Sequence, residues 1–311
     1  MQAIVTLEPT ATALTHGAQL DPALLAGQVA PGTLALYQRD LEQYAAWAAA
    51  AGCDPLTPAT LALWRAALAG AGKSPNTINR QLSSVRAVVK RAAEAGRLPA
   101  DVALRFGAVA GVKVSAMRDK LKADARTRID PADMRRLCDA PDVATLVGLM
   151  HRALLLTLAT SGLRIHEVVT LTSAQIAKRG ASYIVTVTGK GSAEPREAPL
   201  SVEAHHAIET WLVARPVAAE WIFTGFGGRG GRDPRADHIH PVSGWEIVKR
   251  YAAAVGLTGV KPHDFRRFVG TNLAKRDLRQ AQKALGHKDI NTTAKHYVLD
   301  ELEPGLTDGL F

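Results

Sequence analysis

The sequence predicts a mostly helical protein of two domains, with one small antiparallel sheet in the second domain. Three observations predict this fold class. The chain has 311 residues, which is longer than a single hydrophobic core usually grows. Apolar residues recur every three or four positions over most of the chain, as on one face of an amphipathic helix. Clear alternation of apolar and polar residues, the pattern of a strand, is confined to residues 182–188.

Three amphipathic helices are predicted after a loosely ordered lead-in at residues 1–30. The first spans 33–52. The second begins at Thr57, a residue suited to the N-cap, which is followed by Pro58 at the first helical position. The third begins after Ser74, and its apolar line comprises Ile78, Leu82, Val85 and Val89.

The opposite face of the third helix is basic, and so is the stretch that follows this domain. The basic side chains on the helix include Arg80, Arg86, Lys90 and Arg91. Such a face alone is more often simply solvated. Residues 113–129, however, carry six basic and two acidic groups, which is +4 of the net charge of +9. Because their apolar periodicity is weak, we expect a linker that contacts a phosphate backbone. Its candidate contacts are Lys120, Lys122 and Arg126.

The second domain is predicted from residue 130 onward. Asp130 is an N-cap residue with Pro131 behind it, which indicates a short helix. Residues 143–162 are apolar nearly all round, as expected of a central buried helix.

One hairpin and one loop follow. The strand at 182–188 turns through two glycines and returns through 196–201 as an antiparallel hairpin. Residues 225–244 are rich in Gly and predict a mobile loop. The rest of the chain is expected to be helical.

Composition favours some classes of protein and argues against others. The excess of 38 Lys and Arg over 29 Asp and Glu favours a polyanionic partner. No apolar run approaches the roughly 20 residues that cross a bilayer. The N-terminus lacks the order of a signal peptide, so we expect a cytoplasmic protein with no membrane partner. The isolated Cys53 and Cys138 indicate small buried hydrophobes in a reducing compartment.

A metal site is not expected. His238 and His240 lie two apart in the Gly-rich stretch, with no Cys nearby. The stretch "RIHEV" lacks the second His of a zinc-protease motif.

Four separated stretches together carry the residue types of a metal-free phosphoryl transfer. They are "TSGLRIHEV", "TGKG", "HDFRR" and "LGHKDINTTAKHY". Each has an ordinary structural explanation when taken alone. Together they supply six candidate catalytic residues: Arg164, Lys190, His263, Arg266, His287 and Tyr297.

These side chains match the needs of phosphodiester transesterification. Guanidinium groups are permanently charged bidentate donors to the phosphate oxygens of the transition state. A Tyr hydroxyl becomes a nucleophile once a base removes its proton or cations lower its pKa. The leaving oxygen needs a general acid, and a Lys on a hairpin tip is suited to that task.

In these motifs, over roughly residues 158–297, the chain resembles the tyrosine recombinases of the phage-integrase type. The order and spacing of the motifs are highly specific. The resemblance implies that Tyr297 attacks the scissile phosphate, forms a 3′-phosphotyrosyl link and releases a 5′-hydroxyl. It also implies that Arg164 and Arg266 hold the phosphate. No ATP, metal or other cofactor is implied.

The remaining three roles also follow from the resemblance. His287 would hydrogen-bond a non-bridging oxygen, His263 would assist proton transfer from the tyrosine, and Lys190 would protonate the leaving oxygen. One departure is His166, which stands where the family often has Ser or Gly.

The resemblance also implies a domain organisation and a set of partners for this chain. It implies a SAM-like, helical core-binding domain, an α/β catalytic domain with a small sheet, and a clamp on double-stranded DNA. A homo-tetramer would act on two DNA sites through a Holliday junction, with an accessory DNA-bending or directionality protein as a further candidate partner. The expected segments are a lead-in (1–30), the core-binding domain (31–112), the basic linker (113–129), the catalytic domain (130–300) and a tail that docks in cis or in trans (301–311).

Several functions share these motifs. We expect the integrase of a mobile element, and because the lead-in is short we expect it to act without a separate arm-site domain. A Xer-type chromosome or plasmid dimer resolvase would use the same residues. A type IB topoisomerase would relax DNA as a monomer. A DNA-binding protein with a decayed active site is a fourth reading, although all six catalytic positions are occupied.

Overall fold

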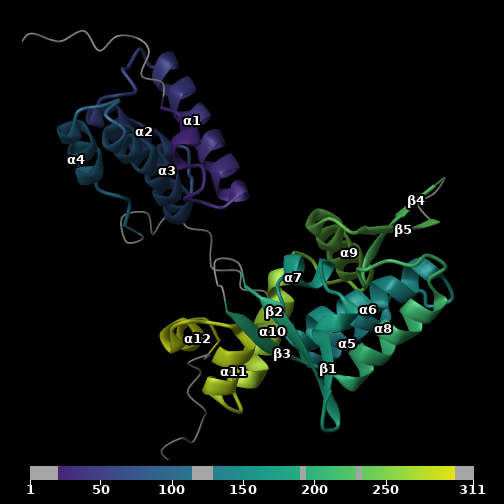
Figure 1. Cartoon of the computed structure of the whole chain (residues 1–311). Coiled ribbons are helices and arrows are strands. Elements are labelled where there is room, and N and C mark those ends of the chain that lie inside the picture. Colours follow the sequence, from purple (N-terminus) through teal and green to yellow (C-terminus); the bar gives the residue numbers. More distant parts are fainter. Residues whose placement is uncertain (1–19, 114–128, 190–193, 229–232, 298–311) are drawn as a thin grey trace, which may run out of the picture. The chain divides into compact units, whose positions relative to one another are not determined.

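The computed structural model describes residues 20–113, 129–189, 194–228 and 233–297 (Figure 1). The chain divides into two compact units, residues 1–125 and residues 126–311. In the part of the chain that the structure describes, no helix has both the length and the hydropathy to span a bilayer.

The N-terminal unit is a set of α-helices preceded by a short 3-10 turn. Its elements are η1 (Pro22–Leu25), α1 (Pro31–Ala50), α2 (Pro58–Gly70), α3 (Pro75–Glu94) and α4 (Ala100–Ala108). Two predicted helix starts are confirmed. The hydroxyl of Thr57 accepts from the backbone N–H of Thr60, and that of Ser74 accepts from the N–H of Thr77.

Helix α3 supplies much of the buried surface of this unit. Ile78, Leu82 and Val85 of the predicted apolar line are fully buried. Tyr44 of α1 and Trp64 of α2 pack with their ring centroids 5.0 Å apart. The phenol of Tyr44 donates a hydrogen bond of 2.9 Å to the carbonyl of Pro55, which satisfies its buried polar end.

The end of the lead-in differs from the prediction. Residues 20–30 contain η1, whose N-cap Asp21 accepts from the N–H of Ala23. Leu25 is buried in the core of this unit. An apolar side chain in a capped turn explains why these residues, expected to be loosely ordered, are part of the fold.

The C-terminal unit is mostly helical and holds two small antiparallel sheets. Its helices are α5 (Pro131–Asp139), α6 (Leu146–Ser161), α7 (Ile165–Val169), η3 (Ser173–Gln175), α8 (Val202–Ala214), α9 (Pro241–Ala254), α10 (Pro262–Ala274), α11 (Leu278–Leu285) and α12 (Ile290–Tyr297). Its strands are β1 (Ile176–Arg179), β2 (Ser182–Thr188), β3 (Pro195–Leu200), β4 (Thr224–Gly227) and β5 (Asp233–His238). The mostly helical fold class with a small antiparallel sheet is confirmed.

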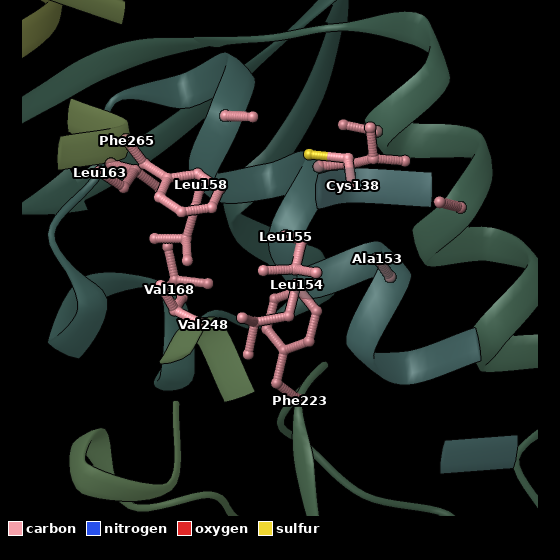
Figure 2. Packing of buried hydrophobic residues seen from close by; sticks show 14 of the residues in the cluster. Cys138, Ala153, Leu154, Leu155, Leu158, Leu163, Val168, Phe223, Val248 and Phe265 are labelled. Atoms are coloured by element: carbon pink, nitrogen blue, oxygen red, sulfur yellow. The ribbon is translucent and has the colours of Figure 1, made fainter. Parts of the chain in front are cut away.

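The core of this unit forms around α6, the predicted central helix. Leu154 and Leu158 of α6 are fully buried, and Phe223 and Phe265 belong to the same core (Figure 2). Helix α6 packs against α5, α8 and α10. Helix α10 in turn contacts α11 and α12, so the segments with the motifs "HDFRR" and "LGHKDINTTAKHY" lie side by side (Figure 1).

The predicted hairpin is present and belongs to a sheet of three strands. The strand order is β1-β2-β3, and all pairs are antiparallel. In its register Val185 faces Ala198, and both side chains are buried. Strand β1 was not predicted, because its four residues carry three exposed positions and show no strand-like alternation.

The prediction of a loop over residues 225–244 is wrong for the described residues 225–228 and 233–244; residues 229–232 lie outside the described part of the chain. Strands β4 and β5 form an antiparallel ribbon there, and α9 begins at Pro241. The ribbon is anchored where Ile239 donates its backbone N–H to the carbonyl of Phe223. Pairing with a buried segment therefore overrides a local composition that is poor in strand-forming residues.

Candidate active site

The first site segment is the junction of α6 and α7. Gly162 ends α6 in the left-handed conformation (φ 66°), which favours glycine. A Cβ at this position would also lie 3.1 Å from a methyl group of Val269. Arg164 follows as the N-cap of α7, and its side chain is 38% exposed.

Glu167 holds Arg164 in place and is itself held by a second arginine. The carboxylate accepts from the backbone N–H of Arg164 at 2.7 Å and from its Nη1 at 3.2 Å. Arg196 of β3 donates from Nη2 to the same carboxylate at 2.7 Å. Burial acts to raise the pKa of Glu167, but these hydrogen bonds and both arginine charges leave the pKa below its ordinary value. Glu167 is therefore a buried carboxylate that stays ionised.

The second segment is α10, where Arg266 is buried. Only 1% of Arg266 is exposed. Its Nη1 donates to the carbonyl of Gly162 at 2.7 Å, and its Nη2 donates to the carbonyl of Leu285. Burial and the nearby charge of Arg164 lower its pKa to about 10, so the guanidinium remains charged at neutral pH. Through these hydrogen bonds Arg266 connects the C-terminal end of α6 with the C-terminal end of α11, and it supplies a buried positive charge.

His263 lies one helical turn before Arg266 on the same face, as the spacing predicts. Its pKa is lowered by partial loss of hydration and by the charges of Arg267 and Arg266, so the neutral form dominates at neutral pH. A neutral imidazole can accept a proton, which suits a general base.

The third segment runs from the end of α11 through α12. Nε2 of His287 lies 3.3 Å from Nη2 of Arg266, and Nδ1 lies 2.8 Å from the hydroxyl of Thr293. Because a guanidinium can only donate, a neutral His287 would accept at Nε2 and carry its proton on Nδ1. The rings of His287 and Tyr297 are stacked, with centroids 5.5 Å apart.

Tyr297 is buried against α10. It is 3% exposed. A Cβ built on Gly270 would lie 2.4 Å from Cδ1 of the Tyr297 ring, so the absence of a side chain at this position makes room for the ring. Arg266 and Tyr297 also interact electrostatically.

The structure thus brings five of the six candidate residues into one cluster. Arg266 makes contact with His287, which stacks on Tyr297, and the charge of Arg164 acts on both Arg266 and His263. The sixth candidate, Lys190, lies outside the described residues.

The candidate DNA contacts on α3 are engaged within the N-terminal unit. Arg80 pairs with the buried carboxylate of Asp40, and Arg86 donates to the carbonyl of Val109. Lys90 and Arg91 both pair with Glu94, and the side chain of Lys90 is 75% exposed. Lys120, Lys122 and Arg126 lie outside the described residues, as does most of the linker.

Two further points concern possible metal ligands and the site residues that were not predicted from the sequence. Among the residues that the structure places, no group of three or more His, Cys, Asp or Glu could hold a metal ion. Three residues of the site were given no role from the sequence: Glu167, Arg196 and Gly270. The spacing of Arg164 and Glu167 was a visible signal. The roles of the other two depend on contacts between distant segments.

Comparison with known proteins places both units in one family. Residues 127–302 match the phage integrase family, and residues 22–96 match the phage integrase N-terminal SAM-like domain. The tyrosine recombinase XerD of Xanthomonas axonopodis pv. citri is 33% identical over 279 residues, which cover 85% of this chain and 86% of that protein. XerC of Pelobacter propionicus is 30% identical over 88% of this chain and 87% of that protein.

Solved structures agree on the fold. The Tn1549 transposon integrase in complex with circular intermediate DNA has a TM-score of 0.63 at 19% identity and covers 90% of this chain and 94% of that chain. The XerH site-specific recombinase bound to palindromic difH substrate has a TM-score of 0.65 at 18% identity and covers 86% of this chain and 77% of that chain. The chain therefore belongs to the phage integrase family of tyrosine recombinases, enzymes that cleave and rejoin DNA.

Proposed function

We propose that this recombinase is the integrase of a mobile element and that it cuts duplex DNA through Tyr297. One observation supports Tyr297 as the nucleophile. Its buried phenol ring packs on His287, and His287 in turn contacts the buried Arg266. A tyrosine oxygen becomes a nucleophile once a base removes its proton.

The proposed cleavage step balances without metal or ATP. The Tyr297 oxygen forms a bond to phosphorus while the bond from phosphorus to the 5′ oxygen breaks. His263 takes the phenol proton, and its lowered pKa supports that role. Lys190 gives a proton to the leaving 5′ oxygen, an assignment that rests on the sequence. The 3′-phosphotyrosyl bond conserves the energy needed for rejoining.

Arg164, Arg266 and His287 would together stabilise the charge on the scissile phosphate. Arg164 is partly exposed and can contact a ligand directly. Arg266 is buried, so it acts on the phosphate through its positive charge. Preorganised donors of this kind stabilise the charge that develops on the phosphate oxygens. His287 would join them as a donor from Nε2 once it is protonated or its tautomer changes.

The proposed partner is double-stranded DNA, bound in the cytoplasm by a homo-tetramer on two sites. The solved relatives with the same fold include complexes with DNA, which supports this choice of partner. Recombination would then proceed through a Holliday junction, with an accessory DNA-bending or directionality protein as a further partner. The tail proposed to dock on the chain's own domain or a neighbouring protomer, residues 301–311, lies outside the described residues.

A second candidate is a Xer-type resolvase of chromosome or plasmid dimers. The specific observation in its favour is that the relatives XerD and XerC are 30–33% identical over 85–88% of this chain. Both candidates use the same cleavage chemistry, so only the DNA site separates them.

The test uses nicked duplexes that trap the covalent intermediate. One set carries the ends of the element beside this gene, and the other carries the dimer-resolution site of the host. We expect a shifted protein–DNA band on a denaturing gel with the first set, and none with Tyr297→Phe. A band only with the second set would establish the resolvase.

Other outcomes would count against the proposal itself. A band that persists in Tyr297→Phe would show that another residue is the nucleophile. Relaxation of supercoiled plasmid by the monomer, without a matched site, would indicate a topoisomerase. The absence of a covalent band on every duplex would indicate a DNA-binding protein.

A further inference from the structure

Arg196 connects the two segments that carry the phosphate-binding residues. Its Nη2 donates to Glu167 at 2.7 Å, and Glu167 holds Arg164. Its Nη1 donates to the carbonyl of Ala284 at 2.6 Å, near the end of α11. The stem of Arg196 passes close to Gly286, where an added Cβ would lie 2.2 Å from Cδ of the arginine. One side chain thus spans from the Arg164 turn to the backbone that leads into His287.

Burial separates the role of Arg196 from that of Arg164. The side chain of Arg196 is 12% exposed, while that of Arg164 is 38% exposed. Both guanidinium Nη groups of Arg196 are already bonded to protein acceptors. Arg196 is therefore poorly placed to bind DNA directly, whereas Arg164 can do so.

The charges around Glu167 show what Arg196 contributes. One ionised carboxylate lies between two arginines, with a distance of 2.7 Å to Arg196 and 3.2 Å to Nη1 of Arg164. Without Arg196, the full negative charge of Glu167 would fall on Arg164. An arginine that is paired in this way would offer less positive charge to a phosphate.

We propose that Arg196 is a positioning residue for DNA cleavage: it neutralises Glu167, so that the charge of Arg164 remains available to the scissile phosphate, and it fixes the backbone ahead of His287. This inference rests on the proposed function, because it concerns the cleavage step at the same site.

The same sheet offers a matched control. Arg179 of β1 pairs with Glu197 of β3 at 2.8 Å, and its side chain is 61% exposed. This pair has the chemistry of the Arg196–Glu167 pair and lies on the surface. Arg179→Met therefore removes an arginine–glutamate pair from the sheet without disturbing the contacts of Arg164.

The experiment measures single-turnover cleavage of a nicked duplex that the wild type cuts, together with DNA affinity. We expect Arg196→Met to slow cleavage about 100-fold, a loss typical of one preorganised electrostatic group. We expect the dissociation constant for DNA to change by no more than about threefold, because uniform binding is not affected. Arg179→Met should cleave at the wild-type rate.

A second substitution distinguishes charge balance from simple cross-linking. Glu167→Gln removes the negative charge and keeps an oxygen for the backbone N–H of Arg164. When it is added to Arg196→Met, we expect cleavage to recover about tenfold, because the unbalanced carboxylate is gone. A double variant no faster than Arg196→Met would overturn the proposal and leave Arg196 as a structural tie.

A further variant covers the case in which Arg196→Met does not fold. Arg196→Gln keeps a donor for Ala284 and loses the charge, and circular dichroism reports its folding. Wild-type cleavage by Arg196→Gln would overturn the proposal, as would equal losses of cleavage for Arg196→Met and Arg179→Met. Failure of the wild type to form a covalent complex on any duplex would instead overturn the proposed function, and this inference with it.

Discussion

Arg164 and Arg266 differ in what the fold requires of each residue. Arg266 is buried and donates to the carbonyls of Gly162 and Leu285. It therefore stabilises the backbone of the site and also supplies a positive charge. Arg164 is partly exposed, and its side chain is bonded to Glu167 alone among the contacts described. Two arginines with the same proposed role in cleavage should therefore differ in their effects on stability.

This difference gives the first prediction. Arg164→Ala and Arg266→Ala should each reduce single-turnover DNA cleavage by about 100-fold or more, with most DNA affinity retained. Arg266→Ala should also lower the free energy of unfolding by about 2–5 kcal/mol, because it leaves two buried carbonyls without a donor. Arg164→Ala should lower it by less than about 1 kcal/mol. Urea unfolding checks stability, and equal losses for the two variants would contradict the distinction.

His151 gives a prediction about pH. It is 5% exposed, and its Nδ1 lies 3.0 Å from the hydroxyl of Tyr251. Burial, with a smaller effect of the Arg250 charge, lowers its pKa from 6.5 to about 4. Between these values the unfolded chain binds a proton that the folded chain does not. Folded-state stability should therefore fall as pH drops from about 6.5 towards 4, by about 3 kcal/mol in all.

The measurement is urea unfolding at pH 7 and pH 4.5. Other groups also titrate in this range, so the comparison is made between variants. His151→Gln should show a smaller loss of stability on acidification than the wild type. His206→Gln, at an exposed position of α8, should keep the wild-type loss. An unchanged loss in His151→Gln would show that this histidine is not the buried group responsible.

At the scale of elements, the contact of α10 with α12 sets the position of the nucleophile. Gly270 lies on α10 where the ring of Tyr297 packs. In Gly270→Ala the new Cβ would overlap both the Tyr297 ring, at 2.4 Å, and a methyl group of Leu285, at 2.9 Å. We expect α12 to shift and cleavage to fall by about tenfold or more, because small misplacements of a reacting group are costly. DNA affinity should be retained.

Gly107→Ala provides the control for this substitution. Gly107 lies in α4, and a Cβ there meets nothing within 4 Å. Alanine in a helix is favoured over glycine by about 1 kcal/mol, so this variant should be slightly more stable and fully active. Wild-type cleavage by Gly270→Ala would show that α12 tolerates the overlap.

The elements that could be predicted are those whose signals are local. Thr57, Ser74 and Asp130 each precede a proline, and each caps a helix with its side chain in the structure. The buried character of α6 also follows from its own residues, since apolar side chains surround it. Capping and periodicity are properties of neighbours in sequence, so a single chain reveals them.

The rest depends on pairs that are distant in sequence. The ribbon of β4 and β5 could not be predicted because it is rich in Gly, Asp and Pro. Its position also depends on the hydrogen bond between Ile239 and Phe223, which lie 16 residues apart. Arg196 lies 29 residues from Glu167 and 88 residues from Ala284, so nothing local marks its contacts. The candidate catalytic residues came from motif order, whereas the residues that position them required the structure.

At the scale of the whole molecule, charge is distributed unevenly along the chain. The described basic residues of α3 are largely paired with carboxylates or bonded to carbonyls. The segment 113–129 instead has six basic and two acidic residues, so its own carboxylates can balance at most two of its six positive charges. If it contacts the DNA backbone, the linker should account for a large share of the salt dependence of DNA binding.

Measurement of DNA affinity against salt concentration tests this. The triple substitution Lys120→Gln, Lys122→Gln and Arg126→Gln should reduce the slope of log affinity against log salt by about 3, since each phosphate contact contributes about 0.9. The control is Arg135→Gln, Arg136→Gln and Arg179→Gln, which changes the net charge equally but removes arginines that are paired with carboxylates. Both triple variants lose three positive charges and therefore lose the same long-range attraction to DNA. A shallower slope of log affinity against log salt in the linker variant alone would thus report the loss of direct phosphate contacts. Equal slopes for the two triples would place the phosphate contacts elsewhere.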